Sequence, residues 1–157
     1  MPDYDKYLER IQAGQKGLNP FLDFMGIETA ELKDGYARFR MPVRPEHLQG
    51  AGKMQGGLIV ALADEAIAHA MMTTLTPNEG LTTIELKSNF LAAVSSGELN
   101  ATATVFKKGS SLVIGDCLVS DDNQWPLQHA QCIAFRAPSM PDFQMIKFLT
   151  STSLPCR

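Results

Sequence analysis

The sequence has little of what usually identifies secreted, metal-binding or nucleic-acid-binding proteins. Its 157 residues include only three cysteines, an odd number at spacings that match no paired zinc-ligand pattern. Cys117 and Cys132 lie in alternating apolar segments, where buried free thiols are expected. A basic excess is also lacking, because the net charge is -3, and this argues against nucleic acid as the main partner. These features favour a reduced, cytoplasmic chain with no metal site.

Targeting segments and long apolar runs are lacking as well. The first ten residues are polar and charged, so no signal peptide is expected. The longest apolar stretch, 57–72, is interrupted by Asp64 and Glu65 and is too short to span a bilayer, so no membrane partner is expected. Apolar residues make up 45% and charged residues 20% of the chain, as in ordinary globular proteins. The length fits one domain, 1–157, with a full core.

One long helix, from 56 to about 75, is the strongest pattern that is present. Apolar side chains occupy most of its circumference, which predicts a helix buried on nearly every side. Its predicted apolar stripe consists of Gly57, Val60, Ala61, Ile67, Ala68 and Met71. Such burial is unusual for a single helix in a small protein, and it suggests that a sheet wraps around the helix.

Alternation of apolar and polar residues predicts six strands. Two precede the long helix and four follow it, at 25–32, 37–43, 82–91, 98–106, 112–120 and about 127–136. Turn residues separate them, and a short amphipathic helix is expected at 3–12. The core therefore spans about 19–137, and a tail, 138–157, follows with a helix indicated at 142–149. This order predicts an α+β hotdog fold, in which a six-stranded antiparallel sheet wraps around a long central helix.

The residues Gln55-Gly56-Gly57, followed by Asp64, form the main chemical motif. Two glycines at a helix N-terminus let the backbone approach a ligand, and the free N–H groups there suit a carbonyl oxygen that becomes negative during acyl transfer. Asp64 lies two turns after Gly57 on the same apolar stripe, where an unpaired carboxylate is costly to bury. It is therefore a catalytic candidate, with a hydrogen-bonded structural carboxylate as the alternative.

The spacing between Gly56 and Asp64 has a consequence for assembly. Eight residues of helix correspond to roughly 12 Å along the axis, which is too far for both groups to act on one carbonyl. If both serve one site, Asp64 must meet the helix N-terminus of a second subunit. The catalytic interpretation therefore predicts an oligomer, most simply a two-fold dimer with two equivalent sites.

The segment 48–57, LQGAGKMQGG, together with Leu62-Ala63-Asp64, resembles the motif of hotdog thioesterases of the phenylacetate-degradation (PaaI-like) type, in the 4-hydroxybenzoyl-CoA thioesterase superfamily. That motif is an Asn, five residues, His-Gly-Gly, six further residues and an Asp, and the spacing matches throughout. More loosely, the resemblance extends over about 19–136. It implies an acyl-CoA thioesterase that needs no cofactor and works as a homodimer or a dimer-of-dimers tetramer.

The resemblance also implies roles for individual residues. Asp64 would be the nucleophile or the general base that activates water, and the Gly56 amide of the other subunit would polarise the thioester carbonyl. Thr83 falls where the family often has a Ser or Thr that helps to hold the attacking water. The period-2 pattern, however, places Thr83 on the face opposite to Ile84 and Leu86.

Two positions depart from the family motif. Gln49 stands in place of the Asn and Gln55 in place of the His; both keep an amide that can hydrogen-bond, but Gln55 cannot become charged. These departures motivate a second hypothesis, a hotdog protein that binds acyl-CoA without cleaving it. A third, a hydratase or dehydratase, needs a positioned His with an acidic partner, and no His is expected beside the helix N-terminus.

The substrate is expected to be a thioester of coenzyme A or of a carrier protein. Its acyl group would lie in an apolar groove between subunits, lined by Met54, Gly57, Leu58 and Ala61. Lys107 and Lys108 either contact the phosphates of coenzyme A or form a solvated turn. Glu65 and His69, four residues apart, predict a contact on the helix surface.

Overall fold

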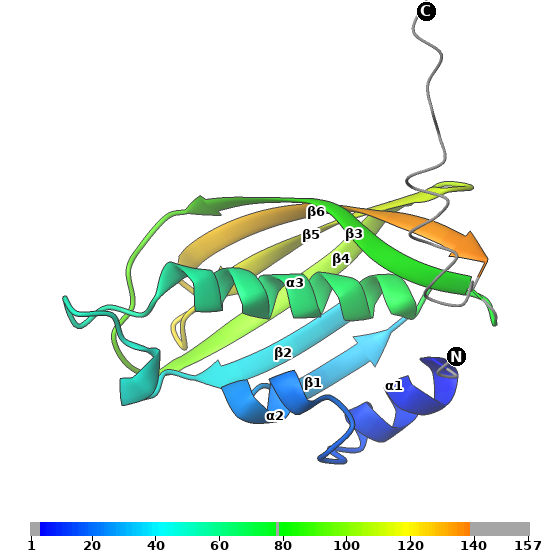
Figure 1. The fold of residues 1–157 in the computed structure, drawn as a ribbon. Coiled ribbons are helices and arrows are strands. Elements are labelled where there is room, and N and C mark those ends of the chain that lie inside the picture. The colour runs from blue at the N-terminus through cyan, green and yellow to red at the C-terminus, as the bar shows by residue number, and fades with distance from the viewer. Residues whose placement is uncertain (1–3, 78, 139–157) are drawn as a thin grey trace, which may run out of the picture.

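In the computed structural model, which describes residues 4–77 and 79–138, a curved antiparallel sheet wraps around one long helix (Figure 1). The elements are α1 (Tyr4–Gln12), α2 (Pro20–Met25), β1 (Glu28–Lys33), β2 (Tyr36–Pro42), a 3-10 turn (Pro45–His47), α3 (Gly56–Met72), β3 (Glu79–Phe90), β4 (Glu98–Lys108), β5 (Leu112–Ser120) and β6 (Pro126–Pro138). The predicted α+β hotdog fold is confirmed. The helix predicted at 142–149 lies outside the described residues, among which no helix is long and apolar enough to cross a membrane.

The strand order of the sheet is β1-β2-β4-β5-β6-β3, and every neighbouring pair is antiparallel. β3 directly follows α3 in the chain but pairs with β6, so it crosses over to the far edge of the sheet. Its 12 residues thus form an edge strand with one side unpaired within the described chain. Long exposed edges of this kind are pairing surfaces for another chain.

The packing of α3 corrects the predicted apolar stripe. The helix buries Ile59, Leu62, Ala63, Ala66, Ile67, His69, Ala70 and Met71, and its main contacts are with β2, β4 and β5. The flank carrying Val60, Ala61, Asp64 and Ala68 is only half-buried, and Gly57 is exposed. The helix is therefore not buried on every side, because one flank of it remains open within a single chain.

A short helix replaces the beginning of the strand predicted at 25–32. α2 starts after Asn19, whose side-chain Oδ1 accepts hydrogen bonds from the N–H groups of Phe21 (3.1 Å) and Leu22 (3.3 Å). It ends at Gly26, whose φ of 69° is the left-handed conformation that terminates many helices. The asparagine cap and the glycine stop therefore delay the strand until Glu28.

A buried polar network joins α1 and α2 to α3. The predicted contact between Glu65 and His69 is present, with 3.6 Å between Glu65 Oε2 and His69 Nδ1, but it lies in the interior and not on the helix surface. His69 is only 1% exposed. The His69 Nδ1 lies 2.7 Å from the backbone oxygen of Glu65. Because a carbonyl oxygen can only accept a hydrogen bond, Nδ1 must carry the proton of the neutral ring. The unprotonated Nε2 then accepts a hydrogen bond from the Tyr7 hydroxyl at 2.9 Å. The Asn19 side-chain amide donates to Tyr7 Oη (3.3 Å) and Glu65 Oε2 (3.4 Å). Burial lowers the pKa of His69 to about 4, which keeps it neutral.

Tyr7→Phe is expected to reduce the free energy of unfolding by about 1–3 kcal/mol, because it leaves the buried His69 Nε2 without its donor. Urea unfolding monitored by circular dichroism would measure the change. Tyr36→Phe is the matched control, since the Tyr36 hydroxyl has no hydrogen-bond partner among the residues that the structure describes. Equal stabilities of the two variants would contradict the network.

Candidate active site

The N-terminus of α3 presents backbone N–H groups that nothing in the described chain caps with a side chain. The turn into the helix is fixed from outside, because the Met54 N–H donates to Val94 O (2.8 Å) and the Gln55 N–H to His47 O (2.9 Å). The first bond that returns into the helix is from the Leu58 N–H to Gln55 O (3.0 Å). The N–H groups of Gly56 and Gly57 therefore remain available for an acceptor at the positive end of the helix dipole.

The two glycines differ in the space around them. A Cβ on Gly56 would lie 3.0 Å from Cζ and 3.1 Å from Cε1 of Phe90, whereas a Cβ on Gly57 would meet nothing within 4 Å. The Phe90 ring, at the end of β3, therefore lies against the first residue of α3. Sequence reasoning missed Phe90, because the contact joins residues 34 positions apart and no local pattern indicates it.

Asp64 lies two turns along α3, on its half-open flank. Its Oδ1 is buried and has no hydrogen-bond partner among the described residues. Burial raises the pKa of the carboxyl, and a hydrogen bond from the Thr83 side chain opposes this shift. An incompletely satisfied, half-buried carboxyl group is an unfavourable structural feature but a suitable base or nucleophile.

A β-bulge brings Thr83 to Asp64 and corrects the predicted orientation of its side chain. In the pairing of β3 with β6, Thr83 lies opposite Ala134 and Glu85 lies opposite the next residue, Ile133, so Ile84 is the extra residue of the bulge. Ile84 is 60% exposed. The bulge reverses the alternation, so Thr83 faces α3 instead of pointing away from it.

The other predicted site residues are distributed unevenly. Met54 is buried beside the helix N-terminus, and Leu58 and Ala61 are half-buried on α3. The Oε1 of Gln49 accepts from the Ala51 N–H (2.6 Å) and is thus held in its own loop, while the Gln55 side chain is exposed. At the other end of α3, Lys107 and Lys108 are both exposed, and the Lys108 Nζ donates to Thr74 O, a carbonyl beyond the end of the helix.

His47 lies beside the N-terminus of α3, contrary to the expectation that no histidine would. Its backbone oxygen accepts from Gln55, but its ring is buried and Nε2 faces the Arg44 guanidinium at 3.0 Å. Burial and the charge of Arg44 lower the pKa of His47. The ring is therefore engaged with Arg44 and does not form the acid–base pair that a hydratase needs.

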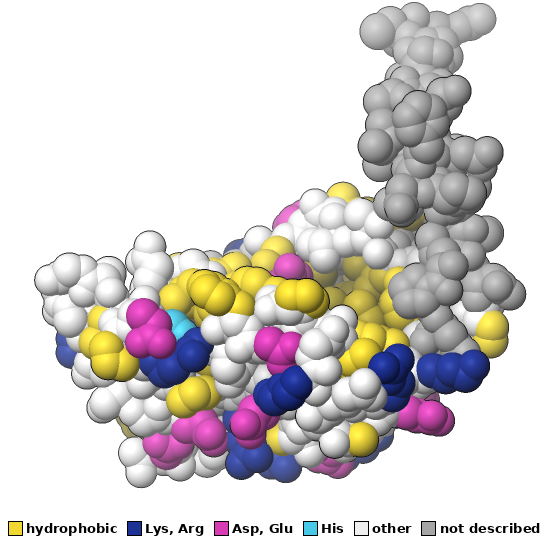
Figure 2. Space-filling view, turned by 60° about the horizontal axis from the view of Figure 1, so that its bottom comes forward, with side chains coloured by type: hydrophobic (Ala, Val, Ile, Leu, Met, Phe, Trp, Pro, Cys, Tyr) yellow, Lys and Arg dark blue, Asp and Glu magenta, His cyan; other side chains and the backbone are white. Residues whose placement is uncertain are grey.

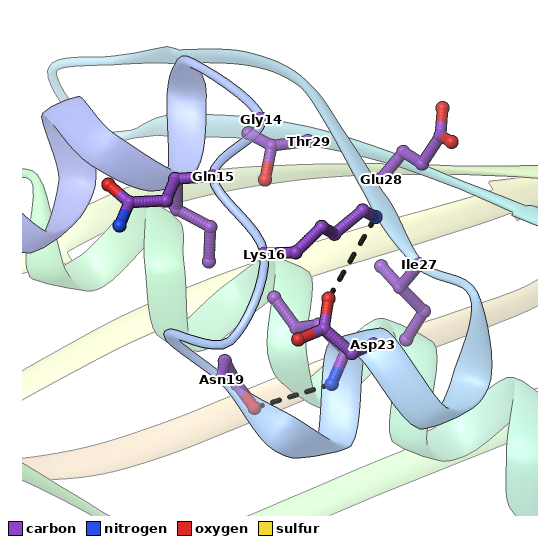
Figure 3. A pocket seen from close by; sticks show the side chains of 10 residues that line it. Gly14, Gln15, Lys16, Asn19, Asp23, Ile27, Glu28 and Thr29 are labelled. Carbon is purple, nitrogen blue, oxygen red and sulfur yellow. Dashed lines mark hydrogen bonds and ion pairs between the residues drawn. The ribbon is translucent and has the colours of Figure 1, made fainter.

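A cavity of about 220 Å³ lies away from these residues, between the α1–α2 connection and β1 (Figure 3). Ile11, Leu22 and Ile27 line it together with polar residues, among them Lys16 and Asp23, and none of the predicted site residues belongs to it.

In the space-filling view toward the helices, hydrophobic side chains are exposed in a band bordered by polar ones (Figure 2). Among the described residues, no cluster of three His, Cys, Asp or Glu side chains could hold a metal ion.

The six-stranded antiparallel sheet wrapped around one long helix defines a protein of the hotdog class. Residues 51–124 match the thioesterase superfamily. A protein of Saccharolobus solfataricus, provisionally named esterase SSO1253, is 31% identical over 101 residues, which cover 64% of this chain and 67% of that protein. The 1,4-dihydroxy-2-naphthoyl-CoA hydrolase of Listeria monocytogenes is 27% identical over 69% of this chain and 88% of its own.

The solved structure of the E. coli PaaI protein matches with a TM-score of 0.76 over 87% of this chain and 97% of that chain, at 21% identity, and shares the fold. The chain therefore belongs to the thioesterase superfamily, and its enzyme class is thioester hydrolase.

Proposed function

We propose that this protein hydrolyses an acyl-CoA thioester to the free acid and coenzyme A, with Asp64 as nucleophile or general base and the Gly56 amide of the partner subunit polarising the carbonyl. The observation that carries the proposal is the Asp64 carboxyl group, which is half-buried, bonded to Thr83 and left with an unpartnered Oδ1. A carboxyl group in this state can take a proton from a water molecule or attack a carbonyl carbon.

A homodimer would complete the site. Gly56 and Asp64 are separated by roughly 12 Å along α3, so one protomer cannot place both on one carbonyl. The free edge of β3 supports a two-fold pairing, because Ile84, Phe90 and Leu91 are large apolar residues exposed along or just after it. The half-open flank of α3, which carries Asp64, would face the partner in such a dimer.

The reaction would proceed through a tetrahedral intermediate. With Asp64 as general base, the carboxylate takes a proton from water, the hydroxide oxygen bonds to the carbonyl carbon, and the partner's Gly56 N–H stabilises the oxyanion. The C–S bond then breaks, and the coenzyme A thiolate leaves and is protonated. With Asp64 as nucleophile, the carboxylate instead displaces the thiolate, and water hydrolyses the resulting anhydride.

The remaining predicted residues would serve binding. Gln55 and Gln49 border the carbonyl site with amide groups, and Met54, Gly57, Leu58 and Ala61 would contact the acyl chain. Lys107 is the better candidate for a phosphate contact, because Lys108 already satisfies the Thr74 carbonyl. The carrier would be coenzyme A or an acyl carrier protein.

Release of free thiol from short, medium, long and aryl acyl-CoAs tests the activity and names the substrate class. Turnover of at least one substrate is expected. Saturable binding without turnover of any substrate would favour the alternative, a protein that binds acyl-CoA without cleaving it. One observation favours this alternative: the Gln49 Oε1 already accepts a hydrogen bond within its own loop.

A mixing experiment tests the shared site. Asp64→Asn and Gly56→Pro protomers, unfolded and refolded together, are expected to recover about a quarter of wild-type activity, because half of the random dimers are heterodimers with one intact site of two. Thiol release before and after mixing measures the recovery, and each variant refolded alone is the control. If both groups served one site within a protomer, mixing would restore nothing.

A further inference from the structure

A third side chain stands behind the Asp64–Thr83 pair. The Sγ of Cys132, on β6, lies 3.9 Å from Thr83 Oγ1, within hydrogen-bond range for sulfur. Cys132 is 1% exposed and sits in the sheet opposite Leu86 of β3 and Gly115 of β5. Burial raises the pKa of Cys132, and the charge of the Asp64 carboxylate adds to this shift. The three groups therefore form a continuous contact from β6 through β3 to α3.

The chemistry of the three groups fixes the direction of their hydrogen bonds. An ionised carboxylate only accepts, so the single proton of the Thr83 hydroxyl must point to Asp64. The lone pairs of Thr83 Oγ1 are then free to accept, and Cys132 is the donor beside them. Burial raises the pKa of Cys132 to about 11, so the thiol keeps its proton at neutral pH and remains a donor.

We propose that Cys132 is a positioning residue of the thioester hydrolase: its S–H group donates to Thr83 Oγ1 and so directs the Thr83 proton to Asp64. This inference rests on the proposed function of Asp64 and adds a role for a residue that the motif does not contain. Cys132 itself contacts neither substrate nor reacting atoms. Without the thiol, the Thr83 hydroxyl loses one of the two contacts that hold its rotamer, and only the hydrogen bond to Asp64 remains.

Three variants separate this role from simple packing. Cys132→Ser replaces the thiol by a hydroxyl whose shorter bond to Cβ leaves its oxygen farther from Thr83 Oγ1 than the 3.9 Å of the sulfur, while Cys132→Ala removes the donor. Cys117→Ala is the matched control, because Cys117 is an equally buried cysteine of the neighbouring strand β5 that lies opposite Ala103 and Ala130. All three variants create at most a small cavity, so their thermal stabilities give the packing contribution separately from the hydrogen-bond contribution.

The first readout is the pKa of Asp64, measured by carbon NMR on protein with labelled aspartate and assigned with Asp64→Asn. A hydrogen bond to the carboxylate favours its charged form, so Cys132→Ala is expected to shift the Asp64 titration upward, by roughly half a pH unit for a weak donor. Cys117→Ala is expected to titrate like wild type, and Cys132→Ser is expected to titrate between wild type and Cys132→Ala, because its oxygen lies farther from Thr83. An unchanged Asp64 titration in Cys132→Ala would overturn the proposal, whether or not the protein turns over any substrate.

The second readout is the pH profile of kcat/KM. The carboxylate is the active form, so activity rises with pH through the Asp64 pKa, and Cys132→Ala is expected to move this rise to higher pH by the same amount. Glu65, the acidic neighbour on α3 whose pKa is raised to about 7 by burial and by the charge of Asp64, is present in every variant, so only the difference between the profiles is assigned to Cys132. In a Thr83→Val background the substitution should change nothing further, because the intermediary is gone. A fall in activity with the pH profile fixed would assign Cys132 a purely structural role. Full activity of Asp64→Asn would instead overturn the proposed function itself.

Discussion

Asp64→Asn is expected to lower kcat/KM for the best acyl-CoA substrate by about 10²–10⁴-fold, the typical contribution of a general base, and more if Asp64 is the nucleophile. The amide has nearly the same shape as the carboxyl group, so the half-open flank of α3 keeps its packing. It cannot, however, accept a proton from water or form an anhydride with the acyl group. Steady-state thiol release over a range of substrate concentrations measures the loss.

Asp116→Asn is the matched control for this experiment. Asp116 lies on the outer face of β5, half-exposed, where it accepts from Thr104 Oγ1 (3.0 Å) and lies 3.3 Å from His129 Nε2. The same change of charge there leaves α3 untouched and should leave kcat/KM within about twofold of wild type, as expected for a surface change. Similar activities of the Asp64 and Asp116 variants would exclude a catalytic role for Asp64.

Gly56→Pro is expected to lower kcat by about 10²–10³-fold, the usual loss when one donor to the oxyanion is removed. Proline removes the Gly56 N–H, adds a ring beside Phe90, and suits the first position of a helix, where that N–H has no partner within the helix. The preceding residue, Gln55, already has the extended conformation that a following proline requires, with φ -65° and ψ 123°. The helix should therefore form normally while the site loses its donor.

Gly56→Ala is the control that isolates the donor from the added bulk. Its Cβ meets the Phe90 ring at the same 3.0 Å, but the N–H group remains. We expect a loss of only several-fold, as the exposed end of the ring shifts by a few tenths of an ångström. Comparable losses for the alanine and proline variants would show that space beside Phe90, and not the amide, limits the reaction. Circular dichroism and the oligomer size should be unchanged in both.

The fold was predictable from the sequence because its signals are local and repeated. The strands β2, β4 and β5 alternate with period 2, and α3 is the only long apolar helix among the described residues, so a sheet around one helix is the arrangement that buries both. The glycine pair and Asp64 were identifiable by their spacing along that same helix. Their separation also predicts that a site containing both needs a second subunit, since the rise of a helix per residue does not depend on the rest of the structure.

Features that depend on contacts between distant segments were decided by the tertiary structure alone. The bulge at Ile84 reverses the alternation of β3, and so it brings Thr83 to Asp64 where the simple period predicts the opposite. The buried ring of His69 has one partner on its own helix, the Glu65 backbone oxygen, but its second partner is the hydroxyl of Tyr7, 62 residues away. The contacts of Phe90 with Gly56 and of Cys132 with Thr83 likewise join residues that are far apart in the sequence, so no local pattern predicts them.

The sequence by itself thus determined the elements, their order and the backbone position of the catalytic candidates, because hydrophobic periodicity and helix geometry act over a few residues. The tertiary structure decided which side chains surround Asp64 and which flank of α3 stays open. Strand register and cross-sheet packing are set by the sum of many long-range contacts, and a shift of one residue moves every side chain of a strand to the other face.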